Sequence, residues 1–333
     1  MAESKRSAWR RAKTFVDFIR QQRRTLPQLR QTLSAPSAHP DFLITGGESG
    51  WTGTGYRVRK GDRFRLAAEG HLWLAKPLAL VLEPRASLYM RIGGDALRKT
   101  VDNDWVYEAW ADGEIELLSK GLSEFADTAG NLLPGKRAPN GPGISVRIEP
   151  SDREPGVDAT PDGWRYLWRI GDGRIYSGDP NDIRVATHGD VGILQSDVDL
   201  PLTGDSELSW DWLVEQLPSD LPEDLAFTHD YLSIAVEFDN GRDLTYMWSA
   251  GLAEGHVFRC PLNWWCERET HWVLRSGADG LGRWHSEKRN IAADYRSALG
   301  EPLPARIVRV WLIANSVFQR RPGAARFAKI SIR

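Results

Sequence analysis

Acidic, basic and aromatic residues that could bind or transform a ligand lie on three segments of the C-terminal half. These are residues 231–238, 271–275 and 307–314, in which apolar side chains alternate with polar or mixed ones. Successive side chains of a β-strand point to opposite faces of a sheet, so one face of each segment is predicted to enter a core. The other face is predicted to carry Glu237, His271, Arg275, Arg309 and Trp311.

Such a face has the chemistry of a saccharide-binding groove. Aromatic rings pack on the apolar C–H faces of a sugar, and charged groups form hydrogen bonds with its hydroxyls. Trp284 and Glu287, in the polar run 283–290, complete the predicted ligand-binding residues. The alternative is a set of cross-strand ion pairs on a solvated face. We expect a saccharide or another small molecule in an open cleft around Glu237 and Arg275.

A pair of carboxylates on the same face makes catalysis a second hypothesis. Residues two apart on a strand lie about 6.6 Å apart at the backbone, so Glu237 and Asp239 are compatible with glycoside hydrolysis. The sequence has no nucleophile elbow, phosphate-binding loop, dinucleotide fingerprint or zinc-protease helix. An enzyme would therefore act on a glycan or another small organic substrate in this groove.

The two cysteines, Cys260 and Cys266, exclude a disulfide-stapled scaffold. We expect two buried free thiols. The alternatives are a local disulfide and a zinc site that also uses His256 and His271.

Length and composition indicate a soluble globular protein of about two domains. The chain has 333 residues, 41% hydrophobic and 26% charged, with a formal net charge of −2. No apolar stretch approaches the roughly 18 to 20 residues of a membrane-spanning helix. The N-terminus lacks the pattern of a secretory signal, which favours the cytoplasm.

Short strands separated by Gly- and Pro-rich turns follow residue 40, which predicts an all-β fold class. The expected architecture is two β-sandwich or jelly-roll domains preceded by a basic amphipathic helix. The predicted segments are a helix and linker (1–40), a first sandwich (41–150), a linker (151–163) and a jelly roll (164–333).

The predicted N-terminal helix is strongly basic, with nine basic and two acidic residues in 1–40. Trp9, Ala12, Val16 and Ile19 recur at helical spacing, with Phe15 and Phe18 beside them. One interpretation packs this stripe on the helix's own domain. The other has residues 1–30 bind an anionic membrane surface or a partner protein, and a homo-oligomer is a further alternative. The rest of the chain is net acidic, which argues against nucleic acid as a partner.

Four motifs of the N-terminal half occur in the order found in a known family. They are GWTGTGYRVRKGDRFRLAAEGHLWLA (Gly50–Ala75), SLYMRIGG (Ser87–Gly94), GEIELL (Gly113–Leu118) and NGPGISVRIE (Asn140–Glu149). Residues 42–150 resemble the galactophilic bacterial lectins, which share a Trp-x-x-Thr-Gly turn, a Val-x-x-Gly-Asp hairpin and an Ala-x-Gly strand. The resemblance implies a β-sandwich that binds galactosides through calcium.

The calcium loop of that family departs from its pattern in this chain. Lys120 and Gly121 stand where the family has an Asn-Asp pair. The oxygen donors that remain are Asp127, Thr128, Asn131 and Asn140. Calcium needs about six to eight converging oxygens, and a lysine opposes a cation. We therefore expect no cofactor, with calcium on these four residues as the alternative.

The C-terminal half resembles an uncharacterised bacterial family of unknown function. The resemblance rests on HDYLSIAVEFDNGRDLTYMWS (His229–Ser249), on GLGRWHSEKRNIAADYRSALGE and on RIVRVWLIANS. It implies a jelly roll akin to carbohydrate-binding domains. The leading hypothesis is a non-catalytic, lectin-like carbohydrate-binding protein. The alternatives are the enzyme described above and a membrane-surface or assembly protein that uses the N-terminal helix.

Overall fold

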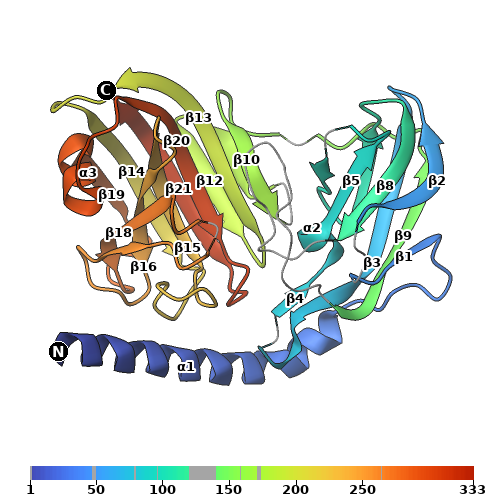
Figure 1. The fold of residues 1–333 in the computed structure, drawn as a ribbon, viewed down its shortest axis with the longest axis horizontal. Helices are drawn as coiled ribbons and strands as arrows, with labels where there is room; N and C mark the ends of the chain where they lie inside the picture. Colours follow the sequence, from blue (N-terminus) through green and yellow to red (C-terminus); the bar gives the residue numbers. More distant parts are fainter. Residues whose placement is uncertain are drawn as a thin grey trace. The chain divides into compact units, whose positions relative to one another are not determined.

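The computed structural model describes residues 2–46, 50–78, 80–95, 97–119, 140–157, 159–170, 174–263 and 265–333 (Figure 1). Nearly half of these residues form β-strands, which one long helix precedes. The predicted all-β fold class with an N-terminal helix is therefore confirmed. No helix among the described residues is long and apolar enough to cross a lipid bilayer.

The chain divides into two compact units. The first, the C-terminal unit, comprises residues 1–18, 159–169 and 174–333. The second, the N-terminal unit, comprises residues 19–158 and 170–173. The first half of the N-terminal helix thus belongs to the same unit as the C-terminal strands.

Helix α1 (Ala2–Thr32) packs on the C-terminal unit through Phe15 and Phe18, the two aromatic residues beside the predicted stripe. The rings of Phe15 and Phe18 lie 5.1 and 5.0 Å from the ring of Phe227. Arg10 forms an ion pair with the buried carboxylate of Asp224.

The predicted stripe of this helix faces solvent at its first positions. Trp9 is 70% exposed and Val16 is 45% exposed. The prediction that the stripe packs on its own domain is wrong for these two residues. The helix turns Thr14 and Phe18, which are four residues apart, toward the protein instead.

The N-terminal unit has two antiparallel sheets. Its strands are β1 (Phe42–Ile44), β2 (Thr52–Val58), β3 (Arg63–Ala75), β4 (Leu80–Leu82), β5 (Leu88–Ile92), β6 (Arg98–Lys99), β7 (Asp104–Glu108), β8 (Gly113–Ser119) and β9 (Asn140–Pro150), with the short helices η1 (Lys76–Leu78) and α2 (Pro84–Ser87). One sheet has the order β1-β9-β3-β4 with β7 paired to β3, and the other has the order β2-β8-β5-β6. Both sheets contribute buried apolar residues, among them Leu66 and Leu117.

The C-terminal unit is a sandwich of two larger sheets. Its elements are β10 (Arg165–Ile170), β11 (Tyr176–Asp179), β12 (Asp182–Thr187), β13 (Val191–Pro201), β14 (Glu207–Gln216), β15 (Tyr231–Phe238), β16 (Asp243–Ser249), β17 (Val257–Arg259), β18 (Glu269–Ser276), β19 (Trp284–Asn290), α3 (Ile291–Leu299), β20 (Arg306–Asn315) and β21 (Gly323–Ile332). The seven-stranded sheet has the order β10-β13-β20-β15-β16-β18-β17. The five-stranded sheet has the order β11-β12-β21-β14-β19.

The main core of this unit lies between the two sheets. Leu232, Ile234, Val236 and Phe238 of β15 pack there with Trp212 of β14, as the alternation predicts. A second, smaller core covers the outer face of the seven-stranded sheet, that is, the face turned away from the other sheet. Glu237 of β15 and Trp311 of β20, two of the predicted binding residues, are therefore buried.

Candidate functional site

Glu237 lies on the outer face of the seven-stranded sheet, as predicted, but in a buried ion-pair network. Its Oε1 accepts a hydrogen bond from Arg268 Nη2 at 2.6 Å, and its Oε2 accepts one from Arg309 Nη1 at 2.8 Å. The Glu237 side chain is 6% exposed. Both oxygens are engaged, so this carboxylate does not face an open cleft. Asp239 lies just beyond β15 and is exposed.

Two other predicted residues of this face are also covered, whereas Arg309 is partly exposed. His271 and Trp311 are both 0% exposed. The Arg268 guanidinium carbon lies 4.8 Å from the centre of the Trp311 ring, and Trp265 meets that ring edge-on. The predicted open groove on this face is therefore wrong, because the smaller core and the segment that carries Arg268 fill it.

Arg275 lies on the opposite side of the sheet from Glu237. In the parallel β16–β18 pair, Met247 is opposite Val273 but Trp248 is opposite Arg275, so β18 has a bulge at Leu274. A bulge adds one residue and reverses the facing of those that follow. Arg275 Nε accordingly donates a hydrogen bond to Glu287 Oε1 at 2.6 Å, on a strand of the other sheet.

Glu287 also belongs to the inner side of the sandwich. Its Oε1 accepts a hydrogen bond from Trp212 Nε1 at 3.1 Å, and its side chain is 15% exposed. The predicted cleft centred on Glu237 and Arg275 is therefore contradicted, since these two side chains stand on opposite faces of the sheet.

Trp284 lies on a third surface, the outer face of the five-stranded sheet. It is 44% exposed, and the Arg326 guanidinium carbon stands 5.2 Å from its ring centre. Trp284 belongs to the first of four cross-strand pairs on this face, which run along the edge strand β19 and its neighbour β14. They are Leu213–Trp284, Asp211–Ser286, Ser209–Lys288 and Glu207–Asn290, which we call the β14–β19 strip.

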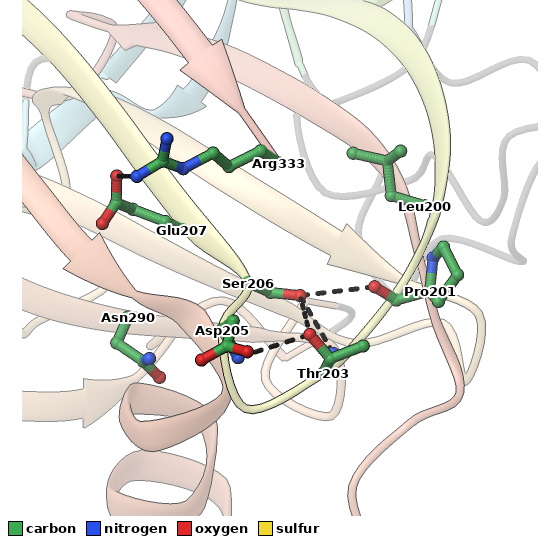
Figure 2. A pocket seen from close by; sticks show the side chains of 8 residues that line it. All are labelled: Leu200, Pro201, Thr203, Asp205, Ser206, Glu207, Asn290 and Arg333. Atoms are coloured by element: carbon green, nitrogen blue, oxygen red, sulfur yellow. Dashed lines mark hydrogen bonds and ion pairs between the residues drawn. The ribbon is translucent and has the colours of Figure 1, made fainter.

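The strip ends at a surface pocket of about 570 Å³ (Figure 2). The pocket is lined by Leu200, Pro201, Thr203, Asp205, Ser206, Glu207, Asn290 and Arg333. Arg333 pairs with Glu207 at 2.9 Å, and Ser206 Oγ accepts a hydrogen bond from Thr203 N at 2.9 Å. Thr203 and Asp205 are exposed. The pocket therefore presents the Thr203 hydroxyl and the Asp205 carboxylate to solvent.

A separate group of ligand-type side chains is buried under the smaller core. Its members are His229, Cys260, Glu269 and His271, whose ligand atoms all lie within 4.8 Å of one another. We call these four residues the His-Cys-Glu cluster. Glu269 and His271 share one face of β18 because they are two residues apart. Cys260 follows β17, which pairs with β18, and His229 precedes β15.

Hydrogen bonds orient two members of the cluster. His229 Nδ1 lies 2.7 Å from the carbonyl oxygen of Glu223, and His229 Nε2 lies 3.4 Å from Cys260 Sγ. Tyr231 donates its hydroxyl proton to Glu269 Oε1 at 2.8 Å. Neither ring nitrogen of the fully buried His271 has a hydrogen-bond partner among the described residues. Its Nε2 is 3.5 Å from Glu269 Oε1.

Burial sets the charge of these groups. It lowers the pKa of His229 to about 3, with the neighbouring His271 acting in the same direction. It also raises the pKa of the Cys260 thiol well above its ordinary value. Burial would raise the pKa of Glu269 as well, but the two histidines and the Tyr231 hydroxyl outweigh it and lower that pKa.

The prediction that both cysteines are buried free thiols is correct only in part. Both are free, but Cys260 is buried while Cys266 is half-buried. Cys266 and His256 lie outside the cluster, whereas Glu269 and His229 belong to it. The Glu-Thr-His spacing at 269–271, with a cysteine nine residues earlier, was the signal in the sequence. The predicted calcium residues Asp127, Thr128 and Asn131 lie outside the described residues, and Asn140 begins β9.

A comparison with sequence families matches most of the C-terminal unit, which is a sandwich of two mainly antiparallel sheets. Residues 174–331 match the profile of a family described as "Protein of unknown function (DUF3047)". The predicted resemblance of the C-terminal half to a family of unknown function is thus confirmed. No curated protein matches the chain.

Several solved structures are similar to about half of the chain. The xyloglucanase domain of NopAA from Sinorhizobium fredii, in complex with cellobiose, has 10% identity and a TM-score of 0.32, covering 53% of this chain and 95% of that one. Endoglucanase 3 from Trichoderma harzianum, of family GH12, has 9% identity and a TM-score of 0.31, covering 53% and 93%. The family 11 carbohydrate-binding module of Lic26A-Cel5E from Clostridium thermocellum has 11% identity and a TM-score of 0.26, covering 51% and 86%. Similarities this low do not identify a ligand or an activity.

Proposed function

We propose that the C-terminal unit binds an oligosaccharide along the β14–β19 strip. The observation that carries the proposal is the half-exposed indole of Trp284 at one end of a row of hydrogen-bonding side chains that ends in a pocket. Of the residues predicted to bind the saccharide, the proposal retains Trp284. It assigns the saccharide to a different sheet face from the one predicted.

The chemistry of the strip suits a sugar chain. An exposed indole gives a flat apolar platform for the C–H face of one sugar ring. Beyond it, Asp211 pairs with Lys329 at 2.7 Å and accepts a hydrogen bond from Ser286. Lys288 pairs with Glu207 at 2.7 Å. Charged groups held in this way present hydrogen-bond donors and acceptors to hydroxyls without further ordering.

The length of the strip favours an oligosaccharide over a monosaccharide. From Trp284 to Asn290 the strand rises by about 20 Å, at roughly 3.3 Å per residue. The pocket of about 570 Å³ at the far end lies within the range of small-molecule sites.

Removal of the indole tests the proposal. Trp284→Ala is expected to weaken the binding of an oligosaccharide about tenfold or more, because the stacking platform is lost. The ligand is found by screening the full chain on a glycan array, and the affinities are then measured by calorimetry. Trp9→Ala is the matched control, since Trp9 is an exposed tryptophan on helix α1. Retention of no glycan, or equal affinity of Trp284→Ala and the wild type, would contradict the proposal.

We propose a second function for helix α1, which is favoured by its exposed apolar stripe. Trp9, Ala12 and Val16 are exposed and lie on one side of the helix. Basic residues, including Lys13, accompany them. An apolar stripe with basic flanks is typical of a helix that lies in the headgroup region of an anionic membrane.

Vesicle flotation tests this function of the helix. The full chain is expected to float with phosphatidylserine-containing vesicles and not with phosphatidylcholine vesicles, because the helix is basic. The double variant Trp9→Ala/Val16→Ala is expected to lose most of this binding, while Trp284→Ala is expected to keep it. Equal flotation of the double variant and the wild type would remove the helix from consideration.

The resemblance of residues 42–150 to galactophilic lectins remains a prediction. The strip and the helix both lie outside these residues, so neither proposal depends on the lectin resemblance or on calcium.

A further inference from the structure

We propose that the His-Cys-Glu cluster binds one divalent transition-metal ion, zinc in first place, and that this ion stabilises the C-terminal unit. The inference is independent of saccharide and membrane binding, because none of the four residues lies on the β14–β19 strip or on helix α1.

The geometry of the cluster is that of a metal site. Two imidazoles, one thiol and one carboxylate are the side chains that zinc uses, and four of them make a complete tetrahedral set. Their ligand atoms lie within 4.8 Å of one another. Ligand atoms that lie about 2.0 to 2.3 Å from a central ion are somewhat closer to one another than 4.8 Å. Small side-chain rotations would therefore bring the four ligand atoms to bonding distance from one ion.

The hydrogen bonds of the cluster fit the same role. His229 holds its Nδ1 against the Glu223 carbonyl at 2.7 Å, which leaves Nε2 directed toward Cys260. A metal-bound histidine commonly donates its other N–H to a carbonyl in this way. The Tyr231 hydroxyl donates a hydrogen bond to Glu269 Oε1, which orients this carboxylate.

The strongest single observation is His271. Its side chain is fully buried, and neither ring nitrogen has a hydrogen-bond partner among the described residues. An unsatisfied buried polar group costs about 1 to 3 kcal/mol. A bound ion removes that cost for one nitrogen, because the nitrogen lone pair becomes a ligand.

The charge of the loaded site is zero. A divalent ion is balanced by the Cys260 thiolate and the Glu269 carboxylate, while both histidines remain neutral. Binding releases the thiol proton to solvent, and the ion lowers the thiol pKa that burial raises. A neutral site is what an apolar environment tolerates, and here Phe258 stacks on His271 at 4.8 Å with Met247 and Val273 nearby in the smaller core.

The chemical types of the four ligands indicate which class of ion binds. The burial of the ligands indicates whether that ion is structural or catalytic. Thiolate and imidazole favour zinc over calcium or magnesium, which prefer oxygen ligands. All four ligands are at least 95% buried. A site closed in this way leaves no open position for a substrate, so the ion is structural.

Metal analysis of the full chain tests the proposal. The protein is purified without a metal-affinity tag, incubated with zinc, dialysed and analysed by mass spectrometry for metal content. We expect about one zinc per chain. We expect chelation to lower the midpoint of thermal unfolding by about 5 °C or more. The proposal is overturned if the chain retains less than about a tenth of a zinc ion. It is also overturned if chelation does not change the midpoint of thermal unfolding of the zinc-loaded chain.

Matched variants assign the ligands. Cys260→Ser and His271→Ala are expected to lose most of the zinc, whereas Cys266→Ser and His256→Ala, which change the other cysteine and a histidine outside the cluster, are expected to keep it. Because a ligand variant could also fail to fold, cobalt is added to the wild type. Cobalt should then give the near-ultraviolet thiolate-to-metal absorption with one thiolate per ion. Absence of that absorption, or equal zinc in Cys260→Ser and the wild type, overturns the proposed ligand set.

Discussion

Replacing Trp212 with alanine is expected to lower the free energy of unfolding of the C-terminal unit by about 3 to 5 kcal/mol. Trp212 is fully buried between the two sheets. Its ring lies 5.6 Å from Trp248, 5.8 Å from Trp210 and 6.2 Å from Phe327. Truncation removes this apolar area and leaves a cavity that the rigid sheets cannot fill.

Urea denaturation followed by far-ultraviolet circular dichroism measures this effect, since tryptophan fluorescence changes with the substitution itself. Trp284→Ala is the matched control, because an exposed residue on the sheet surface is expected to change the free energy by no more than about 0.5 kcal/mol. If both variants unfold at the wild-type urea concentration, the core does not lie where the structure places it.

Glu237→Gln is expected to destabilise the chain by about 2 to 3 kcal/mol, although it changes only one charge. The substitution leaves the guanidinium groups of Arg268 and Arg309 close together without their shared anion. The full cost of breaking a buried pair is reduced here, because these arginine side chains are 22% and 34% exposed and water screens them.

Asp239→Asn provides the control for this prediction. Asp239 is exposed, so its variant is expected to differ from the wild type by no more than about 0.5 kcal/mol. If Glu237 were instead the general acid of an enzyme, Glu237→Gln would lose turnover and keep its stability. Equal unfolding midpoints for Glu237→Gln and the wild type would therefore count against the ion-pair role.

The strands and their core faces were predictable because alternation is a local property. The segment 231–238 coincides with β15, and its apolar positions lie in the main core as predicted. Trp210 and Trp212 alternate with polar residues in β14, and both are fully buried. Helix α3 likewise has local end signals, with Asn290 as its N-cap and Gly300 as its C-cap.

The predicted groove failed for two physical reasons. The bulge at Leu274 reverses the facing of Arg275, and a strict period of two cannot reveal a bulge. The outer face of the seven-stranded sheet is also covered by chain segments that follow β16. Which surface a loop covers depends on long-range packing, so Trp311 was assigned to a groove although it is fully buried.

The His-Cys-Glu cluster was missed for a similar reason. Strands β16 and β18 are parallel neighbours, and the segment that joins them carries Cys260. Parallel neighbours require a crossover connection. The sequence pattern does not predict which residues that connection packs against. The cysteine was therefore considered with Cys266, His256 and His271. Of these only His271 is a spatial partner, and the other two partners are His229 and Glu269.

Strand β19 is the last strand of the five-stranded sheet, so one row of its backbone N–H and C=O groups has no neighbouring strand within the part of the chain that the structure describes. Unprotected edges of this kind promote aggregation through the addition of strands from other molecules. Glu287, Lys288 and Arg289 place charges of both signs in the middle of β19, and such charges oppose that addition. The polar sequence proposed to bind a saccharide would thus also hinder the pairing of β19 with strands of other molecules.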